Sequence, residues 1–432
     1  MHAGRAKPTA CNGVLMVAFH FPPFSGSSGA QRTLAFARHL PRDAWLPIVL
    51  TVRERAYERI ELRDLRHIPP GVPIRRAFAL DAARHFAILG RYPAWLAVPD
   101  RWKSWQPFAY RAGLELIREH RPRVIWSTYP IASAHVIAAR LHARTGIPWI
   151  ADMRDPMVET DPYTGTEYPR DPAVRAARLR IEGEVAVRAA HVVFCTEAAR
   201  EIFVHRFGKH VRNRVSVIPN GYDEDAFREA EAVQAENPAP RSGFRLVHSG
   251  TVYPGDDRGP GALFVAIDML RARGELPKGF RLVLRATGHD AYVSDAIAQS
   301  KLDGLVEIAP SLPYREALRE MLTADGLLLL QGSTSNPAVP AKLYEYLRAR
   351  RPILALVHSE GETAASLRKI RGACIGPLDD AERICITLKA FLDACRTGQA
   401  PLAAMEAVAR FSRSAHASAL AALLSRVALN HG

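Results

Sequence analysis

A lysine and a glutamate stand three residues apart in the stretch PAKLYEYL, where Lys342 and Glu345 share one turn of an expected helix. Pro340 marks the start of this helix, and Leu343 and Leu347 are spaced to bury its opposite face. A lysine can bind a phosphate, and a glutamate can accept hydrogen bonds from both hydroxyls of a ribose. The pair therefore indicates nucleotide recognition, with a weak surface ion pair as the alternative interpretation.

Two glycine-containing loops each follow an apolar run. The first, PPFSGSSGAQR, contains Gly29 and Arg32, and the second, VHSGTVYPGDDRG, contains Gly250, Thr251 and Arg258. Glycine lets the backbone approach a ligand closely, and a helix start favours anions. Neither loop matches G-x-G-x-x-G or a phosphate loop that ends in Lys-Ser/Thr. A diphosphate site and a plain glycine turn are both open interpretations of each loop.

Charged side chains also gather at the end of the apolar run PWIADMRD. This run places Asp152, Arg154 and Asp155 together, and His135 begins a helix after an earlier strand. Such groups can act as acids or bases, or stabilise charge on a reacting group. The structural alternatives are an ion-pair cluster and a core histidine. Position at the carboxyl end of a strand favours a functional role.

Short apolar strands alternate with helical segments along most of the chain, and this alternation predicts parallel α/β sheets. We expect a doubly wound α/β fold with two Rossmann-like domains that face a central cleft. In such sheets ligands bind outside the carboxyl ends of the strands, which is where the residues above are expected to lie.

The domain boundaries follow from a change in composition. We expect an N-terminal domain over residues 1–222, a linker over 223–243, a second domain over 244–404 and a C-terminal helix over 405–432 that packs back on the first domain. The expected linker is acidic, rich in alanine and proline, and has no sustained apolar face.

Composition excludes several classes of protein. The chain has 432 residues, of which 48% are hydrophobic and 24% charged, as in ordinary globular proteins. It contains no apolar run long enough to span a membrane and no apolar segment near the N-terminus, so we expect a cytoplasmic location. The five scattered cysteines indicate reduced thiols without a zinc site.

The net charge of +14 favours an anionic partner. No compact run of Lys and Arg and no zinc-finger or RNA-binding signature is present, so nucleic acid is not an expected partner. The stretch Tyr92–Gly113 mixes Trp, Phe, Tyr, Lys and Arg. It is a candidate patch for peripheral binding to an anionic membrane face, with aromatic packing inside the first domain as the equal alternative.

Five motifs in order resemble the family-four glycosyltransferases, which are retaining, nucleotide-sugar-dependent enzymes with the GT-B fold. PPFSGSSGAQRTLAFARHL resembles the family's first loop and helix, and VIPNGYDEDAF resembles its I-P-N-G-x-D junction. STYPIASAH with PWIADMRDP resembles the S-x-P…H…D-x-R-D-P-W pattern of one bacterial branch. SGTVYPG and KLYEYLRARRPILAL resemble the second-domain loop and the nucleotide-binding helix, so the resemblance covers nearly the whole chain.

The resemblance implies roles for individual residues. Gly29 would lie under the donor phosphates, Lys342 near the diphosphate and Glu345 on the ribose. Arg154 and Asp155 stand where many members have His-Asp beside the reacting sugar. Together with the residues chosen above, the predicted donor-binding set is Gly29, Arg32, Gly250, Thr251, Arg258, Lys342, Leu343 and Glu345, and the predicted catalytic set is Arg154, Asp155, His135 and Asp152.

The chain departs from the family pattern at three positions. Pro337 occupies the place, eight residues before Glu345, where many members have a first glutamate. Met157 replaces the usual tryptophan, and Arg350 stands where a glycine commonly ends the helix, which requires a non-glycine C-cap. These departures bear on the identity of the donor more than on the class of reaction.

The expected activity is metal-independent, retaining transfer of a sugar from a nucleotide-sugar donor to a cell-envelope polysaccharide or lipid-linked acceptor. The nucleotide sugar is a co-substrate, so no cofactor is expected, and the absence of Asp-x-Asp from the expected cleft loops implies no metal. A nucleotide-sugar 2-epimerase, a catalytically weak scaffold or binding protein on the same fold, and a basic nucleic-acid-binding protein are the alternatives.

Overall fold

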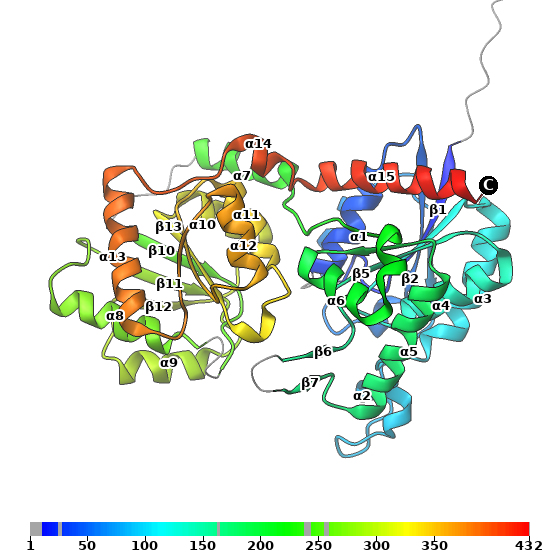
Figure 1. Ribbon diagram of the computed structural model, residues 1–432, viewed down its shortest axis with the longest axis horizontal. Coiled ribbons are helices and arrows are strands. Elements are labelled where there is room, and N and C mark those ends of the chain that lie inside the picture. Colours follow the sequence, from blue (N-terminus) through cyan, green and yellow to red (C-terminus); the bar gives the residue numbers. More distant parts are fainter. Residues whose placement is uncertain (1–10, 25–27, 162–164, 237–242, 255–258, 432) are drawn as a thin grey trace, which may run out of the picture. The chain divides into compact units, whose positions relative to one another are not determined.

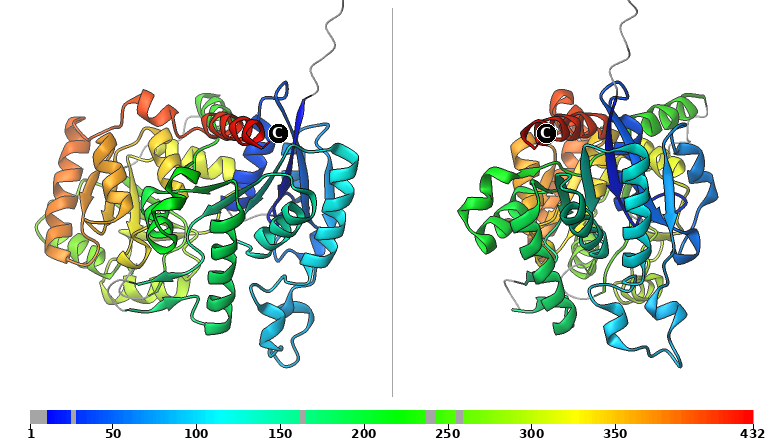
Figure 2. Two further views of the ribbon diagram at one scale, coloured as in Figure 1. Left: turned by 45° about the vertical axis from the view of Figure 1, so that its right-hand side comes forward. Right: turned by 90° about the vertical axis from the view of Figure 1, so that its right-hand side faces the viewer.

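The computed structural model describes residues 11–24, 28–161, 165–236, 243–254 and 259–431. The chain divides into two α/β units (Figure 1). Unit 1 comprises Met1–Pro219 and Arg413–Gly432, and unit 2 comprises Asn220–Ser412. Each unit contains a parallel sheet with helices on both faces, as Figure 2 shows from two further sides.

Within its described residues, unit 1 has a seven-stranded parallel sheet. Its strands are β1 (Asn12–Val17), β2 (Trp45–Val52), β3 (Ile74–Ala77), β4 (Val124–Thr128), β5 (Trp149–Arg154), β8 (His191–Phe194) and β9 (Val215–Val217). They lie in the order β3-β2-β1-β4-β5-β8-β9, so the order reverses between β1 and β4. Strands β6 (Glu159–Thr160) and β7 (Glu167–Tyr168) form a separate antiparallel pair.

The helices of unit 1 begin at capping residues where the sequence supplies them. Asp171 accepts hydrogen bonds from two backbone N–H groups at the start of α5, and Pro172 follows at the first helical position. Thr196 caps α6 in the same way. The helices are α1 (Ser28–His39), α2 (Ala82–His85), α3 (Trp105–His120), α4 (Ser133–Thr145), α5 (Pro172–Arg188), α6 (Glu197–Phe207) and α15 (Arg413–Asn430).

Alternate side chains of each central strand bury on opposite faces of the sheet, as strand geometry requires. In β1, Val14 and Met16 belong to the core under α1 and α15, which includes Leu420. Leu15 and Val17 belong to the core on the other face, under α3 and α4. Both faces are therefore apolar, and the polar groups of unit 1 concentrate at strand ends.

The C-terminal segment differs in its bounds from the expected helix over 405–432. Helix α14 (Met405–Ala409) still belongs to unit 2, and only α15 belongs to unit 1, where it packs against α1. Trp45 Nε1 donates a hydrogen bond to Ser425 Oγ at 3.1 Å, which ties α15 to the start of β2.

Within its described residues, unit 2 has a six-stranded parallel sheet. Its strands are β10 (Arg245–Ser249), β11 (Arg281–Arg285), β12 (Val306–Ala309), β13 (Gly326–Gln331), β14 (Ile353–Val357) and β15 (Cys374–Gly376). They lie in the order β12-β11-β10-β13-β14-β15, so the order reverses between β10 and β13. The remaining helices are α7 (Glu224–Glu236), α8 (Gly261–Ala272), α9 (Asp290–Gln299), α10 (Tyr314–Thr323), α11 (Ala341–Ala349), α12 (Glu362–Ile370) and α13 (Ala381–Thr397).

The prediction of a linker over 223–243 is wrong for most of that segment. The structure forms helix α7 there, which packs against α10 and buries Phe227 completely. Its acidic residues are also bonded, because Glu224 and Glu231 both accept hydrogen bonds from the Arg348 guanidinium at 2.7 Å. The acidic composition therefore marks an ion-paired helix face and not a solvated linker.

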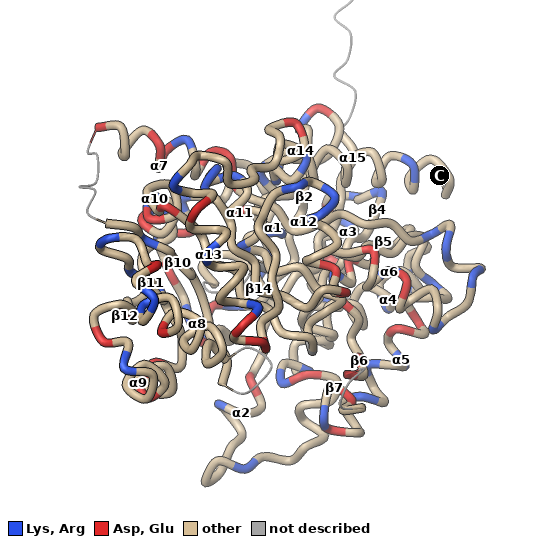
Figure 3. Tube along the Cα trace, turned by 60° about the vertical axis from the view of Figure 1, so that its left-hand side comes forward, with Lys and Arg blue, Asp and Glu red and all other residues tan. Residues whose placement is uncertain are grey.

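The aromatic stretch Tyr92–Gly113 is also divided by the structure. Trp105 is fully buried in the core of unit 1, and Trp102 packs partly buried against that core, whereas Trp95 is 65% exposed. The exposed aromatic side chains of the stretch are therefore Trp95 in its first part and Phe108, 49% exposed, on α3. Lys and Arg are distributed over both units among Asp and Glu (Figure 3). Across the described ranges, no helix combines the length and apolarity that a membrane span needs.

Candidate functional site

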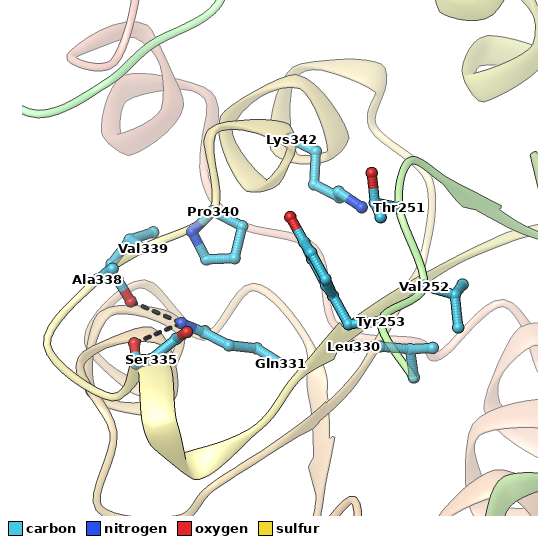
Figure 4. Close-up of a pocket in the computed structure, with 10 residues that line it drawn as sticks. All are labelled: Thr251, Val252, Tyr253, Leu330, Gln331, Ser335, Ala338, Val339, Pro340 and Lys342. Carbon is cyan, nitrogen blue, oxygen red and sulfur yellow. Dashed lines mark hydrogen bonds between the residues drawn. The ribbon is translucent and has the colours of Figure 1, made fainter. Parts of the chain in front are cut away.

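A cavity of about 290 Å³ lies at the carboxyl end of the sheet of unit 2 (Figure 4). Its walls come from the loop after β10 and the loop after β13, the two strands between which the strand order reverses. This is the place where open α/β sheets bind their ligands. The lining residues are Thr251, Val252, Tyr253, Leu330, Gln331, Ser335, Ala338, Val339, Pro340 and Lys342.

The buried amide of Gln331 fixes the loop after β13. Its Nε2 donates to the carbonyl oxygens of Ser335 and Ala338 at 2.8 and 2.9 Å, as the dashed lines in Figure 4 show. Its Oε1 accepts a hydrogen bond from Thr363. With donor and acceptor groups of the amide both bonded, the loop has a defined shape at the rim of the cavity.

Helix α11 begins just after Pro340 and presents Lys342 to this cavity. In Figure 4 the Lys342 side chain points toward Thr251. Leu343 lies one position further along the helix and is only 2% exposed, within the core under α11. The helical period directs the Leu343 side chain away from the cavity, and the donor-binding role of this residue stays a prediction.

His248, in the middle of β10, holds the Lys342 ammonium in place. His248 is 1% exposed, and its Nδ1 lies 2.9 Å from the Leu328 carbonyl oxygen. A carbonyl only accepts, so Nδ1 carries the proton and Nε2 is left as an acceptor. Lys342 Nζ lies 3.3 Å from that Nε2 and donates to it. Burial and then the neighbouring Lys342 lower the pKa of His248 to about 3, which keeps the ring neutral at physiological pH.

Gly250 leaves room for the lysine. Its φ is +121°, and a Cβ at this position would lie 2.7 Å from Lys342 Nζ. A side chain here would both strain the backbone and displace the ammonium. Thr251 lines the cavity and Gly250 lies against Lys342, whereas Arg258 lies outside the described residues.

The His248 contact leads to a testable expectation. Because a hydrogen bond to a charged group is lost, His248→Leu is expected to weaken binding of nucleoside diphosphates about tenfold. His248→Gln, which keeps an acceptor for the ammonium, is expected to retain more affinity. Isothermal titration calorimetry measures both. His191→Leu, which removes a buried histidine from unit 1, is the control, and equal affinities for wild type and His248→Leu would contradict the role of His248.

Glu345 lies on α11 one turn after Lys342 but is not among the residues that line the cavity. Its Oε1 accepts a hydrogen bond from the Tyr314 hydroxyl at 2.9 Å. The helix itself is anchored by Tyr346, whose fully buried hydroxyl accepts from the Ser249 N–H at 2.8 Å. Helix α11 and the end of β10 are thus held together, which fixes the height of Lys342 above the sheet. The predicted C-cap after the helix is present, since Arg350 has a left-handed φ of 58°.

Unit 1 brings together residues that the sequence assigned to separate sets. Arg32 Nε and Nη2 donate to the two carboxylate oxygens of Asp152, both at 2.9 Å, and Thr128 donates to the same carboxylate at 3.0 Å. Asp152 is fully buried, and Arg32 is 6% exposed. Burial disfavours the charged guanidinium, but the Asp152 carboxylate outweighs this and raises the pKa of Arg32. An internal ion pair therefore occupies both groups, and the donor-binding role predicted for Arg32 and the catalytic role predicted for Asp152 stay predictions.

Gly29 lies in the first turn of α1, just after the loop that follows β1. Its carbonyl oxygen accepts a hydrogen bond from the Thr33 hydroxyl at 3.1 Å, one turn further along the helix. The residue is therefore at the amino end of a helix, as the sequence predicted for a phosphate-facing glycine.

Arg154 and Asp155 lie at the end of β5, where the pairing with β8 is irregular. Arg154 has a left-handed φ of 62°, and its Nη1 donates to the Tyr129 carbonyl oxygen at 3.3 Å. A non-glycine residue at this φ is a local strain of the kind found at functional sites. Burial raises the pKa of Asp155, and the neighbouring Arg154 opposes that shift. This place fits a role for both residues at a substrate.

His135 lies in the core of unit 1. It is fully buried in α4, its Nδ1 lies 2.7 Å from Ser127 Oγ, and burial lowers the pKa of His135 to about 4. Its Nε2 has no hydrogen-bond partner among the described residues. The imidazole is therefore neutral and enclosed in the core of unit 1, and the catalytic role of His135 stays a prediction.

Sequence reasoning missed two titratable groups near Arg154. His20 follows β1 and stacks on Phe24 with ring centroids 4.1 Å apart; burial and then the charge of Arg154 lower the pKa of His20 to about 3. Glu159 begins β6, and burial followed by the charge of Asp155 raises the pKa of Glu159 to about 7. The position of His20 directly after an apolar strand was the available signal; Glu159 had none.

The raised pKa of Glu159 predicts a dependence of stability on pH. Between its ordinary value of 4.5 and about 7, the folded protein keeps a proton that the unfolded chain has lost. The stabilisation from this group is therefore present at low pH and falls as pH rises through that window. Glu159→Gln is expected to flatten the free energy of unfolding over this range, measured by urea denaturation at several pH values. Glu184→Gln, on the outer side of α5, is the control, and an unchanged profile in Glu159→Gln would contradict the shift.

A second cavity, of about 600 Å³, lies in unit 1 beside the end of β4. The Tyr129 hydroxyl accepts a hydrogen bond from Arg178 at 3.0 Å in its wall. Aromatic and charged side chains both line it, as in sites for polar organic ligands. Its lining residues are Tyr92, Ala94, Ala97, Pro99, Asp100, Arg101, Trp102, Tyr129, Pro130, Ile131, Asp171, Val174 and Arg178.

Solved structures resemble the chain over nearly its full length. Anabaena Alr3699/HepE, crystallised in complex with UDP, superposes with a TM-score of 0.63 at 15% identity, covering 96% of this chain and 100% of that one. Sucrose-phosphate synthase from Thermosynechococcus elongatus gives 0.66 at 14% identity, covering 96% and 98%. A glycosyltransferase from Rickettsia africae gives 0.64 at 11% identity, covering 97% and 99%. These likenesses show the GT-B fold.

A curated protein of Kineococcus radiotolerans, whose name describes it as a pre-16S rRNA nuclease, is 28% identical over 148 residues. That match covers 33% of this chain and 72% of the other protein, so about two thirds of this chain lie outside it.

The family comparison concerns the unit that contains Arg154 and Asp155. Residues 27–221 match the family model described as glycosyl transferase 4-like domain. This range spans almost all of unit 1 apart from β1 and α15. The chain therefore has the GT-B fold, and its residues 27–221 match a glycosyl transferase 4-like domain.

Proposed function

We propose that the chain transfers a sugar from a nucleoside-diphosphate sugar bound by unit 2 to a saccharide or lipid-linked acceptor of the cell envelope bound by unit 1. The observation that carries the donor assignment is the Lys342 ammonium, held by His248 in a cavity at the switch point of the sheet. An ammonium fixed by a neutral imidazole keeps its full charge for a ligand, and a diphosphate is the anion that suits it.

The charge that develops during transfer explains why this arrangement would help. Breaking the bond between the anomeric carbon and the diphosphate leaves negative charge on the diphosphate oxygens. Lys342 and the positive end of the α11 dipole would stabilise that charge in the transition state. In this proposal the lysine supplies the positive charge, transfer is metal-independent, and the reaction is expected to continue in the presence of a chelator.

The acceptor side is assigned to unit 1 by the place of Arg154 and Asp155 and by the larger cavity. Arg154 would stabilise the reacting sugar or its leaving phosphate, with retention of the anomeric configuration. The cavity next to Tyr129 offers aromatic walls for sugar rings and Arg178 and Asp100 for their hydroxyls. The complexes of HepE with UDP and with UDP-glucose support a nucleotide-sugar donor on this fold.

The proposal can be tested by measuring turnover of the donor without a known acceptor. Incubation with UDP-, GDP- and dTDP-sugars is expected to release nucleoside diphosphate slowly from one of them, because water can replace the acceptor. Early ¹H NMR spectra of the released sugar should show the anomer of the donor, as retention requires. An altered sugar still attached to the nucleotide would instead indicate an epimerase. Binding without any turnover would indicate a scaffold.

A further inference from the structure

An apolar hairpin projects from unit 1 just after α2 (Figures 1 and 2). Ile88 and Arg91 exchange two backbone hydrogen bonds of 2.8 and 3.0 Å, and Leu89 and Gly90 between them both have positive φ, 50° and 76°. These values describe a tight two-residue turn. Phe86, Ile88, Leu89 and Trp95, here called the apolar tip, are 40%, 79%, 98% and 65% exposed.

The base of the hairpin is firmly attached, so the tip is presented on an ordered support. Asp81 is fully buried, accepts the Ala83 N–H at 2.9 Å to begin α2, and accepts Arg101 Nε at 2.9 Å. Lys103 Nζ donates to the Trp95 carbonyl oxygen at 3.2 Å and lies 5.8 Å from the centre of the Trp95 ring. Exposure of four large apolar side chains on such a support is unusual for a surface that meets only water.

Within residues 81–100 the exposed charged side chains are arginines, and the exposed Glu58 is paired with Arg101 at the base of the hairpin. Arg84 and Arg91 are exposed in the same segment, and Lys103 lies beside Trp95. Both carboxylates between residues 81 and 100 are buried, since Asp81 is 0% and Asp100 6% exposed. Two copies of the tip would bring their arginines against each other, which disfavours a symmetric dimer through this surface.

The other side of the same segment lines the larger cavity of unit 1. Tyr92, Ala94 and Ala97 follow the hairpin directly and form part of the wall that also contains Trp102 and Arg178. A partner that receives the apolar tip would therefore lie next to the opening of this cavity.

We infer that the apolar tip inserts into the headgroup region of an anionic lipid bilayer, with Arg84, Arg91 and Lys103 against the lipid phosphates. Ile, Leu and Trp with Arg84, Arg91 and Lys103 beside them match the requirements of such an interface, which takes apolar side chains and attracts basic ones. The inference does not depend on the donor site, and it places the larger cavity where an acceptor carried by a lipid could reach it.

The test uses the full-length protein and sedimentation with vesicles of phosphatidylcholine alone or with about one-third phosphatidylglycerol. Wild type is expected to bind the anionic vesicles, more weakly at high salt. The double variant Ile88→Asp/Leu89→Asp is expected to bind at least about tenfold more weakly, since charged side chains cannot enter the interface. Val187→Asp, which changes a side chain that is 79% exposed on α5, is the matched control and should bind like wild type.

Tryptophan fluorescence gives a second readout of the same contact. Trp45, Trp105, Trp126 and Trp149 are at most 1% exposed, so a blue shift on adding anionic vesicles would report on Trp95 and on the partly buried Trp102. Trp95→Phe is expected to remove the shift. Equal binding by wild type and the Ile88→Asp/Leu89→Asp variant, or no binding by wild type at low salt, would overturn the inference. A dimer in solution that this double variant dissociates would assign the tip to a second copy and would overturn it as well.

Discussion

Lys342→Met is expected to lower the kcat/KM for sugar transfer or donor hydrolysis about a hundredfold, because it removes the charge that meets the leaving diphosphate. Methionine keeps most of the length of the lysine side chain, so the packing around α11 should change little. The larger part of the effect is expected in kcat, since the charge on the leaving group is greatest in the transition state. Initial rates of nucleoside diphosphate release over a range of donor concentrations separate the two contributions.

The matched control is Lys389→Met on α13 of the same unit. Lys389 forms an ion pair with Asp393 at 3.0 Å on the surface and lies outside the cavity. Its replacement should leave the rates unchanged. If Lys342→Met turns over as fast as wild type, Lys342 does not stabilise the leaving group and the donor site must be sought elsewhere.

Asp152→Asn is expected to destabilise unit 1 by about 3 kcal/mol or more, because it leaves the Arg32 charge buried without its counter-ion. This outcome would distinguish the structural role derived from the bidentate geometry from the catalytic role that the sequence indicated. Urea denaturation followed by circular dichroism measures the loss. The double variant Arg32→Met/Asp152→Leu removes both charges and is expected to recover most of the stability.

Asp393→Asn, which breaks an exposed ion pair, is the control and should leave the unfolding transition in place. A stable but inactive Asp152→Asn protein would contradict the structural assignment and return Asp152 to the catalytic set.

The elements of the sheet could be predicted because each has a local signature. The apolar run PWIADMRD became β5 (Trp149–Arg154), and the helix expected to begin at Pro340 became α11 (Ala341–Ala349). Helix α7 was missed, because its buried side is narrow and its acidic residues find their partner, Arg348, more than a hundred residues away. By composition such a segment is polar, and Arg348 comes close to it only in the folded protein.

The residues of the candidate site also fall into those that the sequence could predict and those that it could not. Helical spacing was enough to select Lys342. The residues around Lys342 lie on its own helix and on the elements that pack against this helix. The same spacing predicted that the Leu343 side chain is buried on the opposite face of the helix, where it lies. Arg32 and Asp152 are 120 residues apart, and His248 and Lys342 are 94 apart. A single sequence contains no signal for either pairing, so these roles emerge only from the packing of the strands.

The most direct test of the central claim is calorimetric titration of UDP, GDP and dTDP, each beside its monophosphate and nucleoside, into the full-length protein. The account predicts one binding site, a preference for one base, and at least about tenfold tighter binding of that diphosphate than of its monophosphate, since the second phosphate would contact the lysine. No binding of any diphosphate, or affinity that does not change with the number of phosphates, would contradict a donor site built around Lys342.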